Sequence, residues 1–212
     1  MPRDGSGTKQ RILDTAERLV IENGFAGTSV DEVIAVSGTS KGSFFHHFSS
    51  KTELARALVE RYAAADIAHL HEALHAVAGI TDDPAHQVIE FVRFFEDGAD
   101  ELMAAQSSCL YVSILTERQL AQAGTTEEIL GAVLAWRAEL SSMIGRALAR
   151  GGRDTPIDAE ALADHVFVTF EGAFLLARST GEPAHMRAQL TVLRQLLSAL
   201  LAPVAERRHE SG

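Results

Sequence analysis

The stretch that decides the fold occupies residues 28–51 and reads TSVDEVIAVSGTSKGSFFHHFSSK. It begins with hydroxyl residues just before apolar residues at three- and four-residue spacing, the pattern of a capped helix with one buried face. Gly38 follows as the residue that ends this helix, because glycine accepts the left-handed backbone of a C-cap. Ser40 can cap a second short helix, and Phe44 and Phe48, four residues apart, would anchor it to a core. Two short helices around a glycine turn indicate a helix-turn-helix.

The second of these helices has the composition of a helix that enters a DNA major groove. Gly42 and Ser43 are small, which allows a close approach, and Lys41 is cationic. Base edges in the major groove are read by short polar and charged side chains on such a helix. We therefore expect residues 40–46 to form a recognition helix.

A longer part of the sequence resembles one known family. The run SGTSKGSFFHHFSSK, residues 37–51, together with GFAGTSV, residues 24–30, resembles the DNA-binding signature of the TetR (tetracycline-repressor) family of transcription regulators. The resemblance covers roughly residues 8–54. The family usually has Tyr where Phe45 stands, and that hydroxyl commonly contacts a phosphate. Phe45 keeps the ring and loses this hydrogen bond.

The resemblance implies an all-α fold with two domains. Residues 1–50 would form an N-terminal three-helix helix-turn-helix domain that binds DNA, and residues 51–212 a larger helical domain that binds a ligand and dimerises. Carried onto this sequence, the DNA-binding positions are Thr28, Thr39, Ser40, Lys41, Gly42, Ser43, Phe45, His46, His47 and Lys51.

Composition bounds the class of protein. The chain has 212 residues, 46% of them hydrophobic, which suits a packed core and argues against disorder. No apolar run reaches the length of about 18 residues typical of a transmembrane helix, and the first ten residues lack the apolar core of a signal peptide. A single cysteine excludes an internal disulfide framework. We expect a soluble, cytoplasmic protein with no membrane contact.

The formal net charge of -10 is unusual for a protein that binds DNA. Residues 1–50 hold five basic and six acidic residues, so the acidic excess lies outside the expected DNA-binding head. Because the head is close to neutral, its phosphate contacts must come from a few placed cations, hydroxyls and backbone amides. We expect operator binding that is sensitive to salt, with little non-specific affinity.

Helical periodicity continues through the rest of the chain. Glycine, proline and polar turns separate expected helices over residues 8–23, 50–78, 84–97, 100–106, 109–121, 126–150, 158–179 and 183–204. The helix over residues 50–78 leaves the three-helix head and enters the next domain, so it is the natural lever between the two.

Aromatic residues collect on the helix over residues 84–97. Aromatic residues at helical spacing belong either to a core or to the wall of an apolar ligand pocket. We expect them to meet the apolar faces of three further helices in a pocket with few polar groups. The ligand-binding candidates are Phe91, Phe95, Cys109, Tyr111, Val112, Trp136, Phe170, Glu171 and Phe174.

The last two helices carry more apolar surface than one chain should need. Their spacing of four and three residues is typical of helix-on-helix packing in bundles. We expect a homodimer built on a four-helix bundle, which the family resemblance also implies; the alternative is that both helices close their own domain. The interface candidates are Val166, Phe170, Ala173, Ala177, Met186, Leu190, Leu193, Leu197 and Leu200.

Cys109 is a candidate sensor residue. It stands in the first turn of an expected helix, where the helix dipole can make a thiol more reactive. CLYVSILTE, residues 109–117, and EGAFLLAR, residues 171–178, resemble a subset of TetR-like regulators, some of which respond to electrophiles or oxidants through a cysteine near this position. The alternative is a buried, inert thiol.

Other chemistry has weaker support in the sequence. His69, His71 and His75 can share a transition metal, but no cysteine or carboxylate cluster completes such a site, so we expect no metal and no cofactor. No catalytic motif occurs, and a helical thiol enzyme built on Cys109 would lack a base, so we do not expect an enzyme.

The sequence therefore predicts a homodimeric transcriptional repressor. We expect a small, largely apolar molecule to release it from a palindromic operator in double-stranded DNA. Thiol sensing through Cys109 is the alternative trigger.

Overall fold

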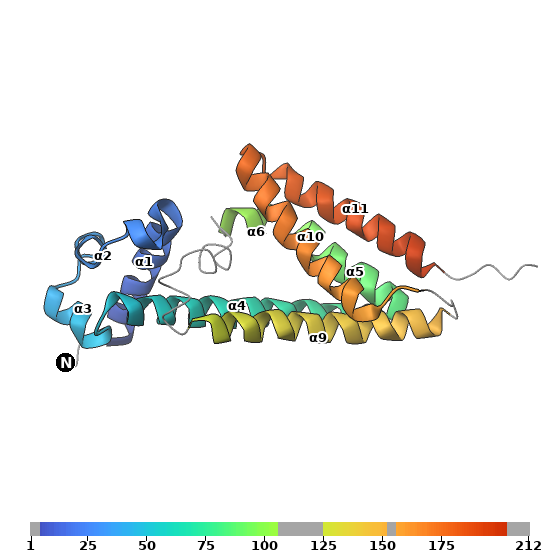
Figure 1. Cartoon of the computed structure of the whole chain (residues 1–212), viewed down its shortest axis with the longest axis horizontal. Helices are drawn as coiled ribbons and strands as arrows, with labels where there is room; N and C mark the ends of the chain where they lie inside the picture. The colour runs from blue at the N-terminus through green and yellow to red at the C-terminus, as the bar shows by residue number, and fades with distance from the viewer. Residues whose placement is uncertain (1–4, 106–124, 152–155, 203–212) are drawn as a thin grey trace, which may run out of the picture. The chain divides into compact units, whose positions relative to one another are not determined.

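The computed structural model describes residues 5–105, 125–151 and 156–202, which form nine α-helices and no strand (Figure 1). The all-α fold class expected from the sequence is confirmed. The described residues divide into two compact units, one with residues 5–67 and 125–133 and the other with the remainder. The division falls inside α4 (Lys51–Ala78) and α9 (Thr126–Arg150), so both helices contribute residues to each unit. A boundary at residue 50 stays a prediction. None of the described helices is both long and apolar enough to cross a membrane.

The first unit contains α1 (Gly5–Gly27), α2 (Val30–Ser37) and α3 (Lys41–His47) together with the start of α4. The regular course of α1 breaks at Gly24, the expected end of the first helix, where φ is 74° and ψ is 161°. A residue with a Cβ would be strained in this conformation. The break lets Phe25, which is buried, join the core of the unit.

A single hydrophobic core holds the first unit together. Buried side chains of α1, α2, α3, α4 and α9 meet in it, among them Ile12, Val33, Phe44, Phe48, Leu54, Leu58 and Ile129. Phe44 and Phe48 are almost completely buried. Burial of a phenylalanine side chain contributes about 2–3 kcal/mol, so these two rings fix α3 to the unit.

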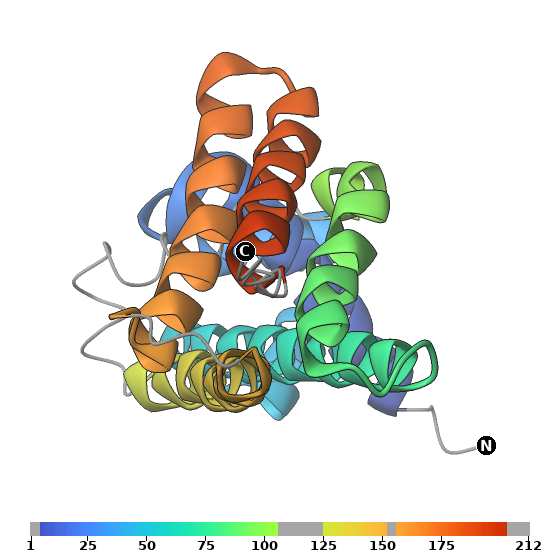
Figure 2. The same ribbon diagram turned by 90° about the vertical axis from the view of Figure 1, so that its right-hand side faces the viewer.

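The second unit contains α5 (Pro84–Asp97), α6 (Ala99–Ala105), α10 (Ala159–Thr180) and α11 (Ala184–Leu201), with parts of α4 and α9. Asp83 caps α5, and Pro84 occupies the first turn, where a missing backbone N–H costs nothing. α11 packs against α10, α5 and α6, and Figures 1 and 2 show α10 and α11 side by side. The helix expected over residues 109–121 lies outside the described residues.

Most of the residues assigned to a dimer interface are buried in the packing of α10 and α11 within this one chain. Seven of the nine candidates are buried inside this one chain: Val166, Ala173, Ala177, Met186, Leu190, Leu193 and Leu197. Phe170 and Leu200 are half-buried. The choice between an interface and the closing of their own domain stays a prediction for these residues. A different apolar set on α10 and α11 stays exposed, namely Val168, Leu175, Leu176, Val192 and Leu196.

A largely buried ion pair joins α5 to α11. The carboxylate of Glu96 accepts hydrogen bonds from Arg194 Nε and from Thr191 Oγ1, the latter at 2.7 Å. The Glu96 side chain is only 12% exposed. The hydrogen bond from Arg194 is the main reason why the pKa of Glu96 lies below its ordinary value; burial opposes it, and the bond from Thr191 adds to it.

We expect Glu96→Gln to lower the free energy of unfolding at neutral pH by about 2 kcal/mol, because it removes the charged acceptor of this pair. A carboxylate with a depressed folded pKa stabilises the fold fully above its unfolded pKa, and this stability is lost as the pH falls through the folded value. Wild type should therefore lose more stability on acidification than the variant. Urea denaturation at a series of pH values measures both effects.

The control is Glu72→Gln, which removes an exposed carboxylate of α4. It should follow the wild-type pH profile. A Glu96→Gln profile parallel to that of wild type would show that the pair does not contribute as described.

Candidate DNA-binding surface and ligand cavity

α2 begins with a reciprocal cap. The Ser29 hydroxyl accepts a hydrogen bond from the Glu32 N–H at 3.1 Å, and the Glu32 carboxylate accepts one from the Ser29 N–H at 3.4 Å. Asp31 and Glu32 stand in the first turn, where negative charge is favoured by the helix dipole. Of the two hydroxyl residues that the sequence offered as caps, Ser29 is the one used.

The turn between α2 and α3 depends on Gly38. Its φ of 64° and ψ of 26° are left-handed, as expected of the residue that ends α2. The N–H of Thr39 bonds to Ile34 O at 3.2 Å, and the hydroxyls of Ser37 and Thr39 lie 2.9 Å apart. These bonds satisfy the end of α2 and fix the angle at which α3 leaves it.

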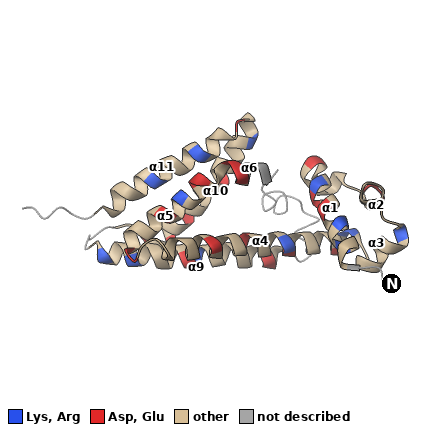
Figure 3. Cartoon of the chain, turned by 180° about the vertical axis from the view of Figure 1, so that it is seen from behind, with Lys and Arg blue, Asp and Glu red and all other residues tan. Residues whose placement is uncertain are grey.

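α3 presents a polar surface over an aromatic anchor. The Ser40 hydroxyl caps the helix by accepting a bond from the Ser43 N–H at 3.1 Å. Phe44 and Phe48 point into the core, and α3 contains no acidic residue (Figure 3). The candidates that remain exposed or half-buried are Thr39, Ser40, Lys41, Gly42, Ser43, Phe45, His46 and His47. The structure therefore brings eight of the ten DNA-binding candidates to one short segment.

Lys41 is the one lysine or arginine of α3. Its amino group lies 3.6 Å from the carboxylate of Asp31, and the two side chains are 72% and 83% exposed. Such an exposed pair contributes about 0–1 kcal/mol, so Lys41 can exchange Asp31 for a phosphate at little cost.

Thr28 and Lys51 are placed differently from the other candidates. Thr28 is 2% exposed, and its hydroxyl donates a hydrogen bond to Gly24 O at 2.9 Å. The Lys51 amino group donates to Phe25 O and lies 4.2 Å from the centre of the Phe25 ring. Both side chains thus hold the bend between α1 and α2. Their phosphate contacts, which the family resemblance assigned, stay predictions.

Four of the ligand-binding candidates form one aromatic cluster in the second unit. The ring centre of Phe95 lies 5.4 Å from that of Trp136 and 5.0 Å from that of Phe170, and the Phe91 ring lies 5.9 Å from Trp136. Three of these rings are buried, as expected of core packing. Phe174 is also buried, and Glu171 is half-buried. Cys109, Tyr111 and Val112 lie outside the described residues.

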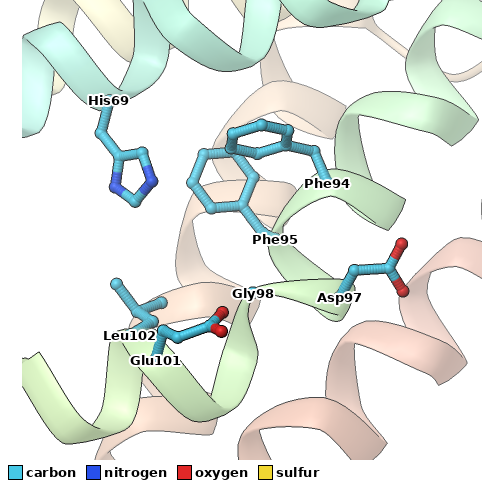
Figure 4. A pocket seen from close by; sticks show the side chains of 7 residues that line it. All are labelled: His69, Phe94, Phe95, Asp97, Gly98, Glu101 and Leu102. Atoms are coloured by element: carbon cyan, nitrogen blue, oxygen red, sulfur yellow. The ribbon is translucent and has the colours of Figure 1, made fainter.

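A cavity of about 570 Å³ opens beside this cluster, a size typical of small-molecule sites. Figure 4 shows the side chains that line it: His69, Phe94, Phe95, Asp97, Gly98, Glu101 and Leu102. Only Phe95 belongs to the candidates named from the sequence. The break at Gly98 between α5 and α6 is the sequence signal that could have suggested the neighbouring lining residues, because they stand on both sides of this break. His69 had no such signal.

Metal binding finds no support in the described part of the chain. No group of three or more His, Cys, Asp or Glu side chains is placed there to hold a metal ion. His71 and His75 are exposed, whereas the ring of His69 packs against Phe94 and Phe95.

An all-α chain with a helix-turn-helix head and a second helical unit with a cavity is the architecture of a DNA-binding regulator. The family model "Bacterial regulatory proteins, tetR family" matches residues 12–58, and "Tetracyclin repressor-like, C-terminal domain" matches residues 84–193. The chain belongs to the TetR family. It is a ligand-responsive, DNA-binding transcriptional regulator.

Several relatives carry regulator names. "Transcriptional regulator AcuR" of Cereibacter sphaeroides is 25% identical over 178 residues, which are 82% of this chain and 78% of that protein. "HTH-type transcriptional repressor NemR" of Escherichia coli is 36% identical over 72 residues, 34% of this chain and 36% of that protein.

Solved structures share the fold over most of the chain. A TetR transcriptional regulator from Chloroflexus aurantiacus superposes with a TM-score of 0.72 at 25% identity, covering 92% of this chain and 96% of that one. The reduced form of Escherichia coli NemR gives a TM-score of 0.68 at 21% identity, covering 89% and 97%.

Two glycine substitutions should separate the stability of the head from DNA binding. A Cβ added at Gly38 or at Gly42 would meet no surrounding atom within 4 Å. The effect of each substitution on folding therefore comes from backbone conformation alone. Gly38→Ala should destabilise the protein by about 1 kcal/mol, because alanine is strained at this left-handed position. Gly42→Ala should raise stability by about 0.5 kcal/mol, because alanine favours helix. Urea denaturation measures these changes.

The effect of Gly42→Ala on DNA affinity should be opposite to its effect on stability. If Gly42 lies against DNA, Gly42→Ala weakens binding although it stabilises the fold. Unchanged affinity in a fluorescence-anisotropy titration would remove Gly42 from the contact surface.

Proposed function

We propose that the chain is a homodimeric repressor that reads a palindromic operator through α3 and leaves it when a small molecule binds in the second unit. The exposed polar face of α3, held on Phe44 and Phe48, is the observation that carries this proposal. A regulator of bacterial DNA acts in the cytoplasm, where that DNA is.

The contacts to DNA follow from the side chains on α3 and its turn. Lys41 supplies positive charge, and the hydroxyls of Thr39, Ser40 and Ser43 supply hydrogen bonds to phosphates or base edges. Phe45 is 45% exposed and offers a ring where the family has a phenol, so we assign it an apolar contact such as one with a thymine methyl group. His47 adds a ring nitrogen at the end of the helix.

The exposed apolar set on α10 and α11 is the best candidate for the dimer interface. Val168, Leu175 and Leu196 each keep about 60% of their surface exposed in the single chain. Apolar patches of this kind on neighbouring helices are typical of association sites. A second copy that packs its own α10 and α11 on this surface would form a four-helix bundle with two-fold symmetry. Two recognition helices would then meet successive major grooves about 34–36 Å apart.

Release by a ligand requires that the ligand favours a conformation that fits DNA poorly. α4 is the natural carrier of this change. Leu54 and Leu58 of α4 lie in the core of the first unit, and His69 of the same helix lines the cavity of the second. A ligand that prefers one position of α4 would therefore alter the placement of the head.

The first test removes the cation of α3. The operator is obtained by selecting bound duplexes from a random-sequence library with purified protein. On that operator we expect Lys41→Ala to weaken binding about fivefold and to reduce the slope of log K against log salt by about 1, because one phosphate contact is lost. Fluorescence anisotropy at several salt concentrations measures both.

The matched control is Arg146→Ala, which removes one exposed cation from α9 in the second unit. It should keep the wild-type affinity and slope. Equal behaviour of the two variants would refute a specific role for Lys41.

The second test concerns the dimer. Leu196→Glu should leave the fold intact and dissociate the dimer, because an exposed position tolerates charge in the monomer whereas a buried, unpaired charge in an interface costs several kcal/mol. Sedimentation velocity measures the state of association, and circular dichroism the fold. Leu193 is only 3% exposed in the single chain. Leu193→Glu should therefore unfold the protein instead of dissociating the dimer, because it buries an unpaired charge in the core.

Ile80→Glu is the control for the dimer test. Ile80 is 59% exposed and stands in the connection between α4 and α5. It belongs to neither α10 nor α11, the helices that carry the proposed interface. This variant should remain dimeric. A dimeric Leu196→Glu protein would place the interface elsewhere.

A further inference from the structure

Carboxylates crowd the end of α5 and the start of α6, and most of them are neutralised by a partner. Glu90 lies 2.9 Å from Arg93 and 3.0 Å from His86. Glu96 pairs with Arg194, and Asp100 lies 2.9 Å from Arg187. Three of the acidic side chains in this region are thus held by arginines.

The two remaining carboxylates are the ones that line the cavity. Asp97 and Glu101 form no ion pair with any residue in the described ranges. Among the described residues, no lysine or arginine lines the cavity. Asp97 lies in the field of Arg194, and its backbone carbonyl accepts a hydrogen bond from Arg187 at 3.4 Å. In the part of the chain that the structure describes, Glu101 is therefore the carboxylate of the lining without a neighbouring arginine.

The walls of the cavity are aromatic. The His69 ring centre lies 5.9 Å from that of Phe94 and 5.3 Å from that of Phe95. In Figure 4 Glu101 extends from α6 on the opposite side of the space from His69, beneath Phe95, while Asp97 is directed away from His69. Glu101 thus faces the space below Phe95, and Asp97 lies at its edge.

These features discriminate between kinds of ligand. An anion would be repelled by both carboxylates. A neutral, wholly apolar molecule would cover carboxylates without replacing the water they lose. A cation with an aromatic or compact apolar body meets both requirements, because its charge faces a carboxylate and its body lies on aromatic rings.

We propose that this cavity binds an organic cation, such as a quaternary ammonium or a protonated amine attached to an aromatic body. The proposal rests on the proposed function only for the consequence of binding, which is release of DNA. It replaces the largely apolar effector expected from the sequence with a charged one. Glu101 is the main counter-charge.

Binding is tested on the full chain without DNA. The probes are benzyltrimethylammonium, its uncharged carbon isostere neopentylbenzene, and phenylacetate as an aromatic anion. Trp136 is the single tryptophan of the chain, and its ring lies 5.4 Å from that of Phe95, so its fluorescence reports on the cavity wall. We expect saturable binding of the cation, confirmed by calorimetry, and weaker binding of the other two probes.

Charge-removing variants locate the site. Glu101→Gln keeps the shape of the side chain, and we expect it to weaken binding of the cation about fivefold, the scale of a partly exposed ion pair. Its affinity for neopentylbenzene should stay the same. Asp100→Asn is the matched control: it removes the neighbouring charge of α6, which Arg187 already neutralises, and should bind the cation like wild type.

The outcomes separate this inference from the proposed function. Equal affinity for cation and isostere, tighter binding of phenylacetate, absence of saturable cation binding, or equal effects of Glu101→Gln and Asp100→Asn would each overturn the inference and leave DNA binding by α3 intact. Cation binding that depends on Glu101 but leaves operator affinity unchanged would uphold the inference and overturn release of DNA through this cavity.

Discussion

The burial of Phe44 and Phe48 is the interaction on which the DNA-binding surface depends. α3 has only seven residues, far fewer than a helix needs to persist alone in water. Its position is therefore set from outside, by two rings in the core and by the left-handed turn at Gly38. Because the rings occupy one side of the helix, the polar side chains between them must face outward. A single packing requirement thus produces both the fold of the head and the surface that we propose to meet DNA.

Local signals explain why much of the head could be predicted from the sequence. A hydroxyl cap, a glycine turn and two phenylalanines four residues apart each act over a few residues, so their effect is visible in the sequence. The choice between Thr28 and Ser29 was not visible, because it depends on the bend at Gly24. That bend turns Thr28 inward to bond with Gly24 O and leaves Ser29 to cap α2.

Tertiary partners explain what the sequence could not supply. Periodicity finds an apolar stripe but does not say whether its partner is the same chain or a second one. On α11, Leu193 packs within the chain while Leu196, three residues later, stays exposed, so both sides of the helix carry apolar residues. The cavity is a similar case, because His69 belongs to α4 whereas the other lining residues belong to α5, α6 and the residue between them. Which carboxylates near the cavity are neutralised also depends on arginines about 90 residues away in the sequence, because Arg187 pairs with Asp100 and Arg194 with Glu96.

The distribution of charge bears on both DNA binding and effector binding. Nearly all of the net charge of -10 lies outside residues 1–50, so the remainder of the chain repels the DNA phosphates and confines contact to the head. Affinity then comes from few contacts, which favours recognition of one sequence over general attraction to DNA. The same acidic excess raises the local concentration of cations around the second unit. An anionic effector would have to enter against this field, whereas the organic cation that we propose would be drawn toward the cavity that Glu101 lines.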